Sequence, residues 1–348
     1  MKLMSGLLSF VLGITLSLLS TSATHAELPA WLDVDHFPAR DSLDVTPDAE
    51  PETEECRRGL IWQPTTFEVT CESASEDRGD LLVRFASPIS TGNDVNDRVA
   101  MEWYVATDAE SQPMRAPAVV VVHESGRGMV VGRLCAKGLR EQGLHTFLIH
   151  LPYYGERRGE GRPDDAQRIF EVFRQGIADV RRARDAVAVL PFVDTDHIAL
   201  QGTSLGGFVS ATCGGIDSGY DSLFLLLAGG NLFEMLQHGK RDAAKAREKL
   251  AAAGITGERL RALTRGIEPN RLAHRLRPEC TWLYSGEYDT VVPIDNAVSL
   301  ASTAGLDPTH HIRLSADHYS GIVFLPFILR HIPEQIMTIH DGTGDTQD

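Results

Sequence analysis

The chain has few cysteines and few basic residues for its 348 residues, and both shortages exclude classes of protein. None of the five cysteines is part of a Cys-x-x-Cys motif, which argues against a zinc ribbon. The 33 Lys and Arg residues face 48 Asp and Glu residues, so the net charge is −15. Nucleic acids and anionic membranes bind basic surfaces, and we therefore expect neither as a partner.

Long apolar runs are also scarce, and the longest lies near the N-terminus between Leu7 and Leu19. It is shorter than the roughly 20 residues that span a bilayer. Lys2 precedes it, and the small, polar stretch "STSATHA" follows it and ends at Ala26. This pattern is typical of a secretory signal peptide. We expect residues 1–26 to be removed, the protein to be periplasmic or extracellular, and no stable membrane insertion.

Residues 27–115 are predicted to form an N-terminal extension. Its first part, to about residue 79, is acidic and weakly periodic, and "LDVTPDAEPETEE" is typical of an exposed arm. The stretches "LLVRFASP" (81–88) and "RVAMEWYVA" (98–106) are predicted strands. Cys56 and Cys71 are close in sequence, and an exported protein permits disulfides, so these two are candidates to pair. Cys135 and Cys213, on predicted helices, are expected to be small core residues.

From residue 116 to about residue 340, apolar strands alternate with helical segments. "APAVVVVHE" is continuous and rich in valine, as in a strand that is buried on both faces of a parallel sheet. A long helix is expected to begin at a cap on Asp164 or Asp165 and to end at Pro191. The other predicted strands are "LHTFLIHLP", "HIALQG", "DSLFLLLAGG", "CTWLYSG" and "THHIRLSA". Such alternation predicts an α/β fold with a mostly parallel sheet and helices on both faces.

Ser204 lies in "HIALQGTSLGGFVSA", where a predicted strand passes directly into a predicted helix. Gly202 and Gly206 flank it at two residues on either side. A serine nucleophile on a sharp strand-to-helix turn needs such neighbours, because Cβ atoms there would clash. The helix N-terminus beyond it also favours negative charge. The alternative interpretation of Ser204 is an ordinary helix cap.

A serine nucleophile needs a base and an acid that orients the base, and two later loops supply candidates. Asp289 in "GEYDTVVP" and His318 in "DHYSG" each follow a predicted strand. The carboxyl ends of parallel strands meet at one edge of the sheet, so the two side chains are expected near Ser204. Competing acids are Glu287, Asp295 and Asp317, while His310 and His311 begin a strand and are expected to be structural.

The motifs "GTSLGG", "GEYDTVVP" and "DHYSG", in this order, resemble those of α/β-hydrolases over about residues 115–340. The segment "VVVVHESGRG" is similar to that of the dienelactone hydrolase and acetyl esterase branch, although Ser204 stands where dienelactone hydrolases carry Cys. The resemblance implies a serine esterase, for which we expect no cofactor. We also expect no metal site, because "HES" lacks the second His of the HExxH motif and no other His/Asp spacing fits. It implies an oxyanion hole formed by the backbone N–H groups of Leu205 and Ser125, with Glu124 as the next choice.

Three further regions are candidates for substrate contact. By the same resemblance, Glu124 contacts the resting nucleophile; alternatively it faces solvent or forms a salt bridge with Arg127 or Arg133. The loop "LPYYGERRGEGR" opens at the same sheet edge, so Tyr153, Tyr154, Arg157 and Arg158 are candidate pocket residues, the arginines alternatively forming structural ion pairs. Residues 231–276 form a helical insertion, either a lid or a surface helical pair.

The resulting hypothesis is an exported serine hydrolase that cleaves a small-molecule or carbohydrate ester through an acyl-enzyme. Two alternatives remain at this stage. One is a peptidase similar to prolyl oligopeptidase, for which the extension is too short to form a propeller. The other is a catalytically silent binding protein of the same fold. The sequence does not set the acyl group, the alcohol or the oligomeric state.

Overall fold

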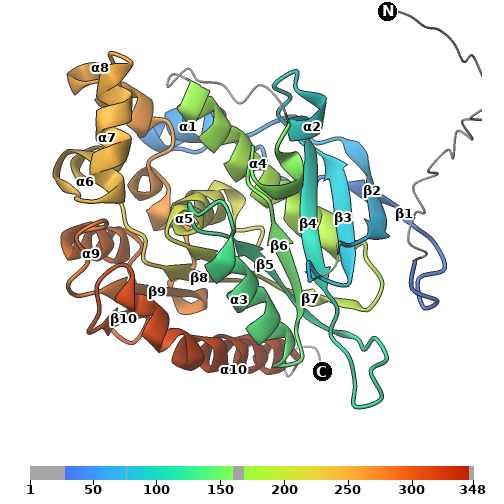
Figure 1. Cartoon of the computed structure of the whole chain (residues 1–348). Helices are drawn as coiled ribbons and strands as arrows, with labels where there is room; N and C mark the ends of the chain where they lie inside the picture. The colour runs from blue at the N-terminus through green and yellow to red at the C-terminus, as the bar shows by residue number, and fades with distance from the viewer. Residues whose placement is uncertain (1–27, 76, 160–167, 345–348) are drawn as a thin grey trace, which may run out of the picture.

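A computed structural model describes residues 28–75, 77–159 and 168–344. A mixed sheet of ten strands, in the order β1-β2-β3-β4-β6-β5-β7-β8-β9-β10, has helices on both faces (Figure 1). The strands are β1 (His36–Arg40), β2 (Thr66–Ser73), β3 (Leu81–Ala86), β4 (Arg98–Tyr104), β5 (Ala116–Val122), β6 (His145–Ile149), β7 (Val193–Thr203), β8 (Ser222–Leu226), β9 (Thr281–Gly286) and β10 (His311–Leu314).

The helices fall into those that cover the sheet and those of the insertion. The first group is α1 (Pro51–Arg58), α2 (Asp94–Asp97), α3 (Val130–Arg140), α4 (Arg168–Ala188), α5 (Leu205–Asp217), α9 (Ile294–Thr303) and α10 (Leu325–Gly344), with the 3-10 turns η1 (Gly155–Arg157), η4 (Pro278–Cys280) and η5 (Ser320–Phe324). The insertion holds α6 (Leu232–His238), α7 (Asp242–Ala252), α8 (Gly257–Arg265), η2 (Pro269–Arg271) and η3 (Ala273–Arg275). The predicted capping residues Asp164 and Asp165 of α4 lie outside the described residues.

Strand β5 shows why the sequence folds as an α/β sheet. All seven of its residues are buried. Val119 and Val121 belong to a core cluster with α3 and α10, whereas Val120 and Val122 belong to the cluster that contains α4 and α5. Since side chains alternate along a strand, each face needs its own helical layer. β6, β5, β7, β8, β9 and β10 pair in parallel, as predicted.

The prediction of an exposed arm before residue 79 is wrong. β1 pairs antiparallel with β2, β2 with β3, β3 with β4, and β4 with β6, so the N-terminal extension continues the main sheet. Short runs of apolar residues form the core of this extension, and Leu60, Val69 and Leu81 are fully buried. The overall acidic composition of the segment hid these runs. The predicted strands 81–88 and 98–106 correspond to β3 and β4.

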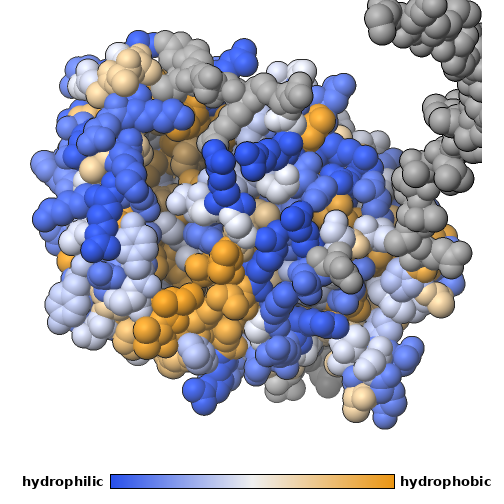
Figure 2. All heavy atoms as spheres, viewed as in Figure 1, coloured by the Kyte–Doolittle hydropathy of each residue, from blue (hydrophilic) through white to orange (hydrophobic). Residues whose placement is uncertain are grey.

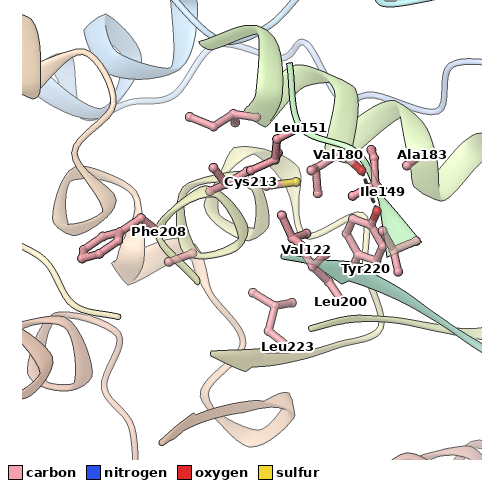
Figure 3. Close-up of a cluster of buried hydrophobic side chains, with 14 of the residues drawn as sticks. Val122, Ile149, Leu151, Val180, Ala183, Leu200, Phe208, Cys213, Tyr220 and Leu223 are labelled. Carbon is pink, nitrogen blue, oxygen red and sulfur yellow. Dashed lines mark hydrogen bonds between the residues drawn. The ribbon is translucent and has the colours of Figure 1, made fainter. Parts of the chain in front are cut away.

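Cys213 on α5 shows how tightly the helix packs against the sheet and α4 (Figure 3). Its thiol points toward Leu151 and Val180 in the close-up, and Tyr220 closes the cluster by donating its hydroxyl hydrogen to the Val180 carbonyl at 2.6 Å. Burial raises the pKa of the Cys213 thiol, which therefore stays neutral. Cys135 on α3 is equally buried. Both cysteines are core residues, as expected.

Cys56 and Cys71 do not pair, contrary to the disulfide considered from their spacing. Both thiols are free and buried, Cys56 on α1 and Cys71 on β2. Burial raises the pKa of Cys56 to about 11 and that of Cys71 to about 12. They act as small apolar residues of the extension's core.

The segment Ser320–His340, which comprises η5 and most of α10, is the described segment long and apolar enough to cross a membrane by length and composition. In the structure one side of α10 packs on the sheet, with Leu325, Ile328, Ile332 and Ile336 buried. Only 28% of its apolar window is buried, however. The exposed side is apolar at its start, with Ile322, Val323 and Phe327, and carries Arg330 and Glu334 further along.

Four buried histidines predict that the fold loses stability in mild acid. Burial lowers the pKa of His123 (to about 3), His145, His150 and His197 below 6.5. Below pH 6.5 the unfolded chain therefore binds protons that the folded chain does not. Each histidine should reduce the free energy of unfolding by up to about 1.4 kcal/mol per pH unit.

Asp179 and Glu268, whose pKa values burial raises, act in the opposite sense but are fewer. The urea midpoint should fall from pH 7.5 to pH 5.5. A midpoint that is constant or higher at pH 5.5 would show that these histidines take up protons in the folded state.

Candidate active site

Ser204 occupies a strained turn between β7 and α5. Its φ is 52° and its ψ −112°, a conformation that residues with a Cβ seldom adopt. Its N–H donates to the Leu226 carbonyl of β8 at 2.8 Å, and its carbonyl accepts from Phe208 in the first turn of α5. The side chain thus stands at the carboxyl edge of the sheet, as a nucleophile elbow requires.

The two flanking glycines are required by close packing of backbone. A Cβ on Gly206 would lie 2.1 Å from the Val122 carbonyl oxygen of β5. A Cβ on Gly202 would lie 2.3 Å from the Gly206 carbonyl oxygen. Glycine is therefore needed at both positions because α5 lies so close to the end of β5. This close packing also brings Ser204 next to the loop after β5.

Ser204, His318 and Asp289 meet in one hydrogen-bonded chain. Ser204 Oγ lies 2.9 Å from His318 Nε2, and His318 Nδ1 lies 2.6 Å from Asp289 Oδ2. A carboxylate only accepts hydrogen bonds, so Nδ1 carries the proton and Nε2 accepts from the serine hydroxyl. The other Asp289 oxygen accepts from the N–H groups of Val291 and Val292 at 2.8 and 2.9 Å, which fixes the carboxylate.

The competing residues have other partners. Asp317, next to His318 in sequence, accepts from the N–H groups of Tyr319 and Ser320 at 2.9 and 2.8 Å and so shapes the loop. His310 stacks on Trp282, and His311 is hydrogen-bonded to Ser285 at 2.6 Å, so both are structural as expected.

His123 sets the conformation of the loop after β5, which carries the predicted oxyanion donor, the Ser125 N–H. Leu151 donates its N–H to His123 Nε2 at 3.2 Å, so Nδ1 carries the proton and donates to the Glu124 carbonyl at 2.6 Å. In a trans peptide the next N–H points opposite to that carbonyl. The Ser125 N–H is therefore directed away from His123, and Ser125 lines the cavity that contains Ser204. Burial lowers the pKa of His123 to about 3 and keeps the ring neutral.

Leu205, the other predicted donor, is the first residue of α5. The N–H groups of the first helical turn have no acceptor within their own helix, and the helix dipole favours an anion there. Leu205 and Ser125 therefore lie on the two elements that approach each other at Gly206.

Glu124 caps a helix rather than pairing with an arginine. Its carboxylate accepts from Val131 at 3.2 Å and Gly132 at 3.0 Å, at the start of α3. Arg133 instead pairs with Glu102 at 2.6 Å and donates to the Gly128 carbonyl, so it links the loop between β5 and α3 to strand β4. Burial alone would raise the pKa of Glu102, but hydrogen bonds from His150, Arg133 and Tyr104 outweigh it and set that pKa at about 2.

The predictions for the loop after β6 need correction. Arg157 is fully buried, pairs with Asp179 at 2.8 Å and donates to the Asn96 and His150 carbonyls, so it holds structure and does not face the cavity. Tyr153 is also buried, and its N–H donates to Asn96 at 3.0 Å. Tyr154 supports the loop after β5: its hydroxyl donates to the Ser125 carbonyl at 3.0 Å, and its ring packs on His123. The amino-acid sequence of this loop gave no sign of which side chains turn into the protein and which would line a pocket.

A cavity of about 270 Å³ opens beside Ser204 and His318. One part of its wall comes from Glu124, Ser125 and Gly126 in the loop after β5, and a larger part is apolar. The apolar residues are Val131, Leu226, Leu227, Leu314, Ile322, Leu325 and Ile328. Most of this wall comes from β8, β10, η5 and α10, which sequence reasoning treated only as scaffold.

The 231–276 insertion contacts the histidine loop directly. Tyr319, beside His318, donates its hydroxyl to Asp242 at the start of α7 at 2.9 Å, and the Arg241 guanidinium lies 5.0 Å from the Tyr319 ring centroid. Asp242 and Tyr319 both line the cavity. Sequence reasoning missed both residues, although Tyr319 directly follows the predicted base. Among the described residues, no cluster of three His, Cys, Asp or Glu residues could hold a metal ion.

Comparison with solved structures identifies the fold. No protein-family model and no curated protein matches the chain. An acetyl xylan esterase from Paenibacillus sp. R4 superposes with a TM-score of 0.61 at 14% identity, covering 84% of this chain and 96% of that one. Acetyl xylan esterase 1 from Thermoanaerobacterium sp. JW/SL YS485 gives 0.57 at 15% identity, over 84% and 95%. An α/β hydrolase from Penicillium sp. sh18 gives 0.52 at 16% identity, over 75% and 98%. The chain therefore has the α/β-hydrolase fold, as the motifs implied.

The approach of α5 to β5 predicts a large difference between two glycine substitutions. Gly206→Ala should destabilise the protein by more than about 2 kcal/mol, because the Val122 carbonyl oxygen cannot give way without moving β5. The matched control is Gly59→Ala at the end of α1, where a Cβ meets only ordinary contacts and φ is −78°. That variant should be neutral or slightly stabilising. Equal urea midpoints for the two variants would contradict the close approach.

Proposed function

We propose that this chain is an exported serine hydrolase that cleaves carboxylic esters through an acyl-enzyme. The observation that carries the proposal is the chain of hydrogen bonds from Ser204 through His318 to Asp289, at 2.9 and 2.6 Å, on a strained turn at the cavity wall. The fold likeness to two acetyl xylan esterases supports an ester as the substrate class.

In the proposed mechanism His318 Nε2 takes the proton of Ser204 as Oγ attacks the ester carbonyl carbon. The carbonyl oxygen becomes an oxyanion, which the N–H groups of Leu205 and Ser125 stabilise, each by roughly 3 kcal/mol. Asp289 stabilises the imidazolium. His318 then gives its proton to the leaving alcohol, and an acyl-serine remains. Water, deprotonated by His318, attacks this ester and releases the acid.

Neither alternative gains from the structure. The residues before β5 continue the main sheet rather than forming a propeller, which removes the basis for a prolyl-oligopeptidase-like peptidase. A silent binding protein of this fold usually lacks one of the three catalytic residues, whereas Ser204, His318 and Asp289 are all present and hydrogen-bonded. Export remains part of the proposal on the N-terminal pattern, which lies outside the described residues. Sequencing the mature protein's N-terminus tests it, with Glu27 the expected first residue.

Removal of the nucleophile should abolish ester cleavage. Ser204→Ala is expected to lower kcat on p-nitrophenyl esters by at least about 10³-fold, because no covalent intermediate can form. A fluorophosphonate probe should label the parent at Ser204 and leave the variant unlabelled. Ser210→Ala, which removes a buried hydroxyl of α5, is the matched control and should keep its activity. Full turnover by Ser204→Ala would overturn the proposal, and an unlabelled parent would favour the silent protein.

Asp289→Asn should separate orientation of the base from folding. An amide can donate to His318 Nδ1, which places the ring proton on Nε2 and removes its ability to accept from Ser204. The loss in kcat should be about 10⁴-fold, with KM much less affected. Asp317→Asn alters the neighbouring acid and should lose little activity. Equal losses in both variants would argue against Asp289 as the acid.

A further inference from the structure

The cavity wall indicates which esters this site accepts. We infer that the preferred substrate is an ester with an apolar chain of several carbons, rather than an acetyl ester of a sugar. The inference rests on the proposed function and deepens it. The cavity of about 270 Å³ has room for roughly nine groups of the size of a water molecule or a methylene, at roughly 30 Å³ each. An acetyl group alone would fill little of it, so the rest of the volume has to be filled by the alcohol part or by a longer acyl chain.

The apolar wall lies next to the reacting groups. Leu226 is the last residue of β8, and its carbonyl holds the Ser204 N–H. Leu325 and Ile328 face the same cavity from the first turn of α10 and are themselves buried. An apolar group beside Ser204 would therefore be removed from water along its length, which is the source of hydrophobic binding energy.

Four polar residues of the wall already have partners in the protein. The Tyr284 hydroxyl is hydrogen-bonded to His331 at 2.6 Å, and Thr203 accepts from Gln201 at 2.9 Å. Glu124 is held by the α3 N–H groups, and Asp242 by Tyr319 and Lys245. A sugar would therefore find only the remaining lone pairs of these carboxylates and hydroxyls, together with the Ser125 side chain, as partners. In the proposed mechanism the substrate carbonyl meets Ser204 and the N–H groups of Leu205 and Ser125.

The apolar surface continues outward from the cavity. We call the exposed residues Val130, Leu134, Ile322, Val323 and Phe327 the apolar rim. Val323 is 73% exposed and Val130 61%, and Ile322 belongs to both the rim and the cavity wall. Figure 2 shows this surface as an orange patch over α3 and the start of α10. We assign the rim to the distal part of the same substrate chain, because the shared Ile322 makes the two surfaces continuous.

Two ester series test the inference. One consists of p-nitrophenyl alkanoates from acetate to decanoate, and the other of acetates of 1-butanol, 1-hexanol and 1-octanol. In at least one series kcat/KM should rise about threefold to fourfold per methylene until the cavity is full, at about six to eight carbons. A steady fall from the shortest ester in both series would overturn the inference.

Variants of Ile328 tie the preference to the cavity. In the series whose rate rises with chain length, Ile328→Phe narrows the chamber and should lower the ratio of kcat/KM on the six-carbon ester to that on the shortest ester by at least tenfold, whereas Ile328→Ala should move the optimum to longer chains. Met337→Phe, an exposed position of α10 outside the cavity, is the matched control and should leave the ratio unchanged. Melting temperatures report whether each variant folds. An unchanged ratio in folded Ile328 variants would overturn the inference.

The two levels of proposal fail differently. Turnover of acetates but not of longer esters leaves the esterase proposal standing and removes only the chain preference. Turnover of no ester above the Ser204→Ala background overturns both.

Discussion

The site depends on the close approach of α5 to the end of β5. Gly206 lies so near the Val122 carbonyl that no larger residue fits, and this contact brings the start of α5 against the loop that carries Ser125. Ser204, between strand and helix, takes a positive φ as a consequence. The same contact places Ser204 and Ser125 at one cavity, where the proposed mechanism has the N–H groups of Leu205 and Ser125 bind the oxyanion. The strain is held by packing on both sides of the sheet.

A second layer of residues supports this arrangement without facing the cavity. His123 fixes the Glu124 peptide, Tyr154 binds the Ser125 carbonyl, and Arg133 holds the loop at Gly128 while pairing with the buried Glu102. Buried charged and polar groups of this kind are costly unless fully bonded. These contacts fix the loop after β5 in one conformation. The proposed mechanism needs this, because the Ser125 N–H must have its direction set before a substrate binds.

The sequence predicted the parts of the molecule that local patterns determine. The run of valines predicted β5, and strand-end positions predicted that Ser204, Asp289 and His318 would meet. Residues whose roles depend on tertiary contacts could not be read in this way. The acidic composition around Cys56 concealed strands that complete the sheet, and "YYGERR" gave no sign that Arg157 turns inward to Asp179. Leu325 and Ile328 form part of the cavity wall because of how α10 crosses the sheet, and no motif marks such a crossing.

The most direct test of the account is a crystal structure of the protein after reaction with an alkyl fluorophosphonate that carries an octyl chain. We predict a phosphorus atom bonded to Ser204 Oγ. Its oxygen should lie within hydrogen-bond distance of the Leu205 and Ser125 N–H groups, and the octyl chain should lie along Leu325 and Ile328. A covalent bond at another residue, or a phosphoryl oxygen that faces away from both N–H groups, would contradict the account.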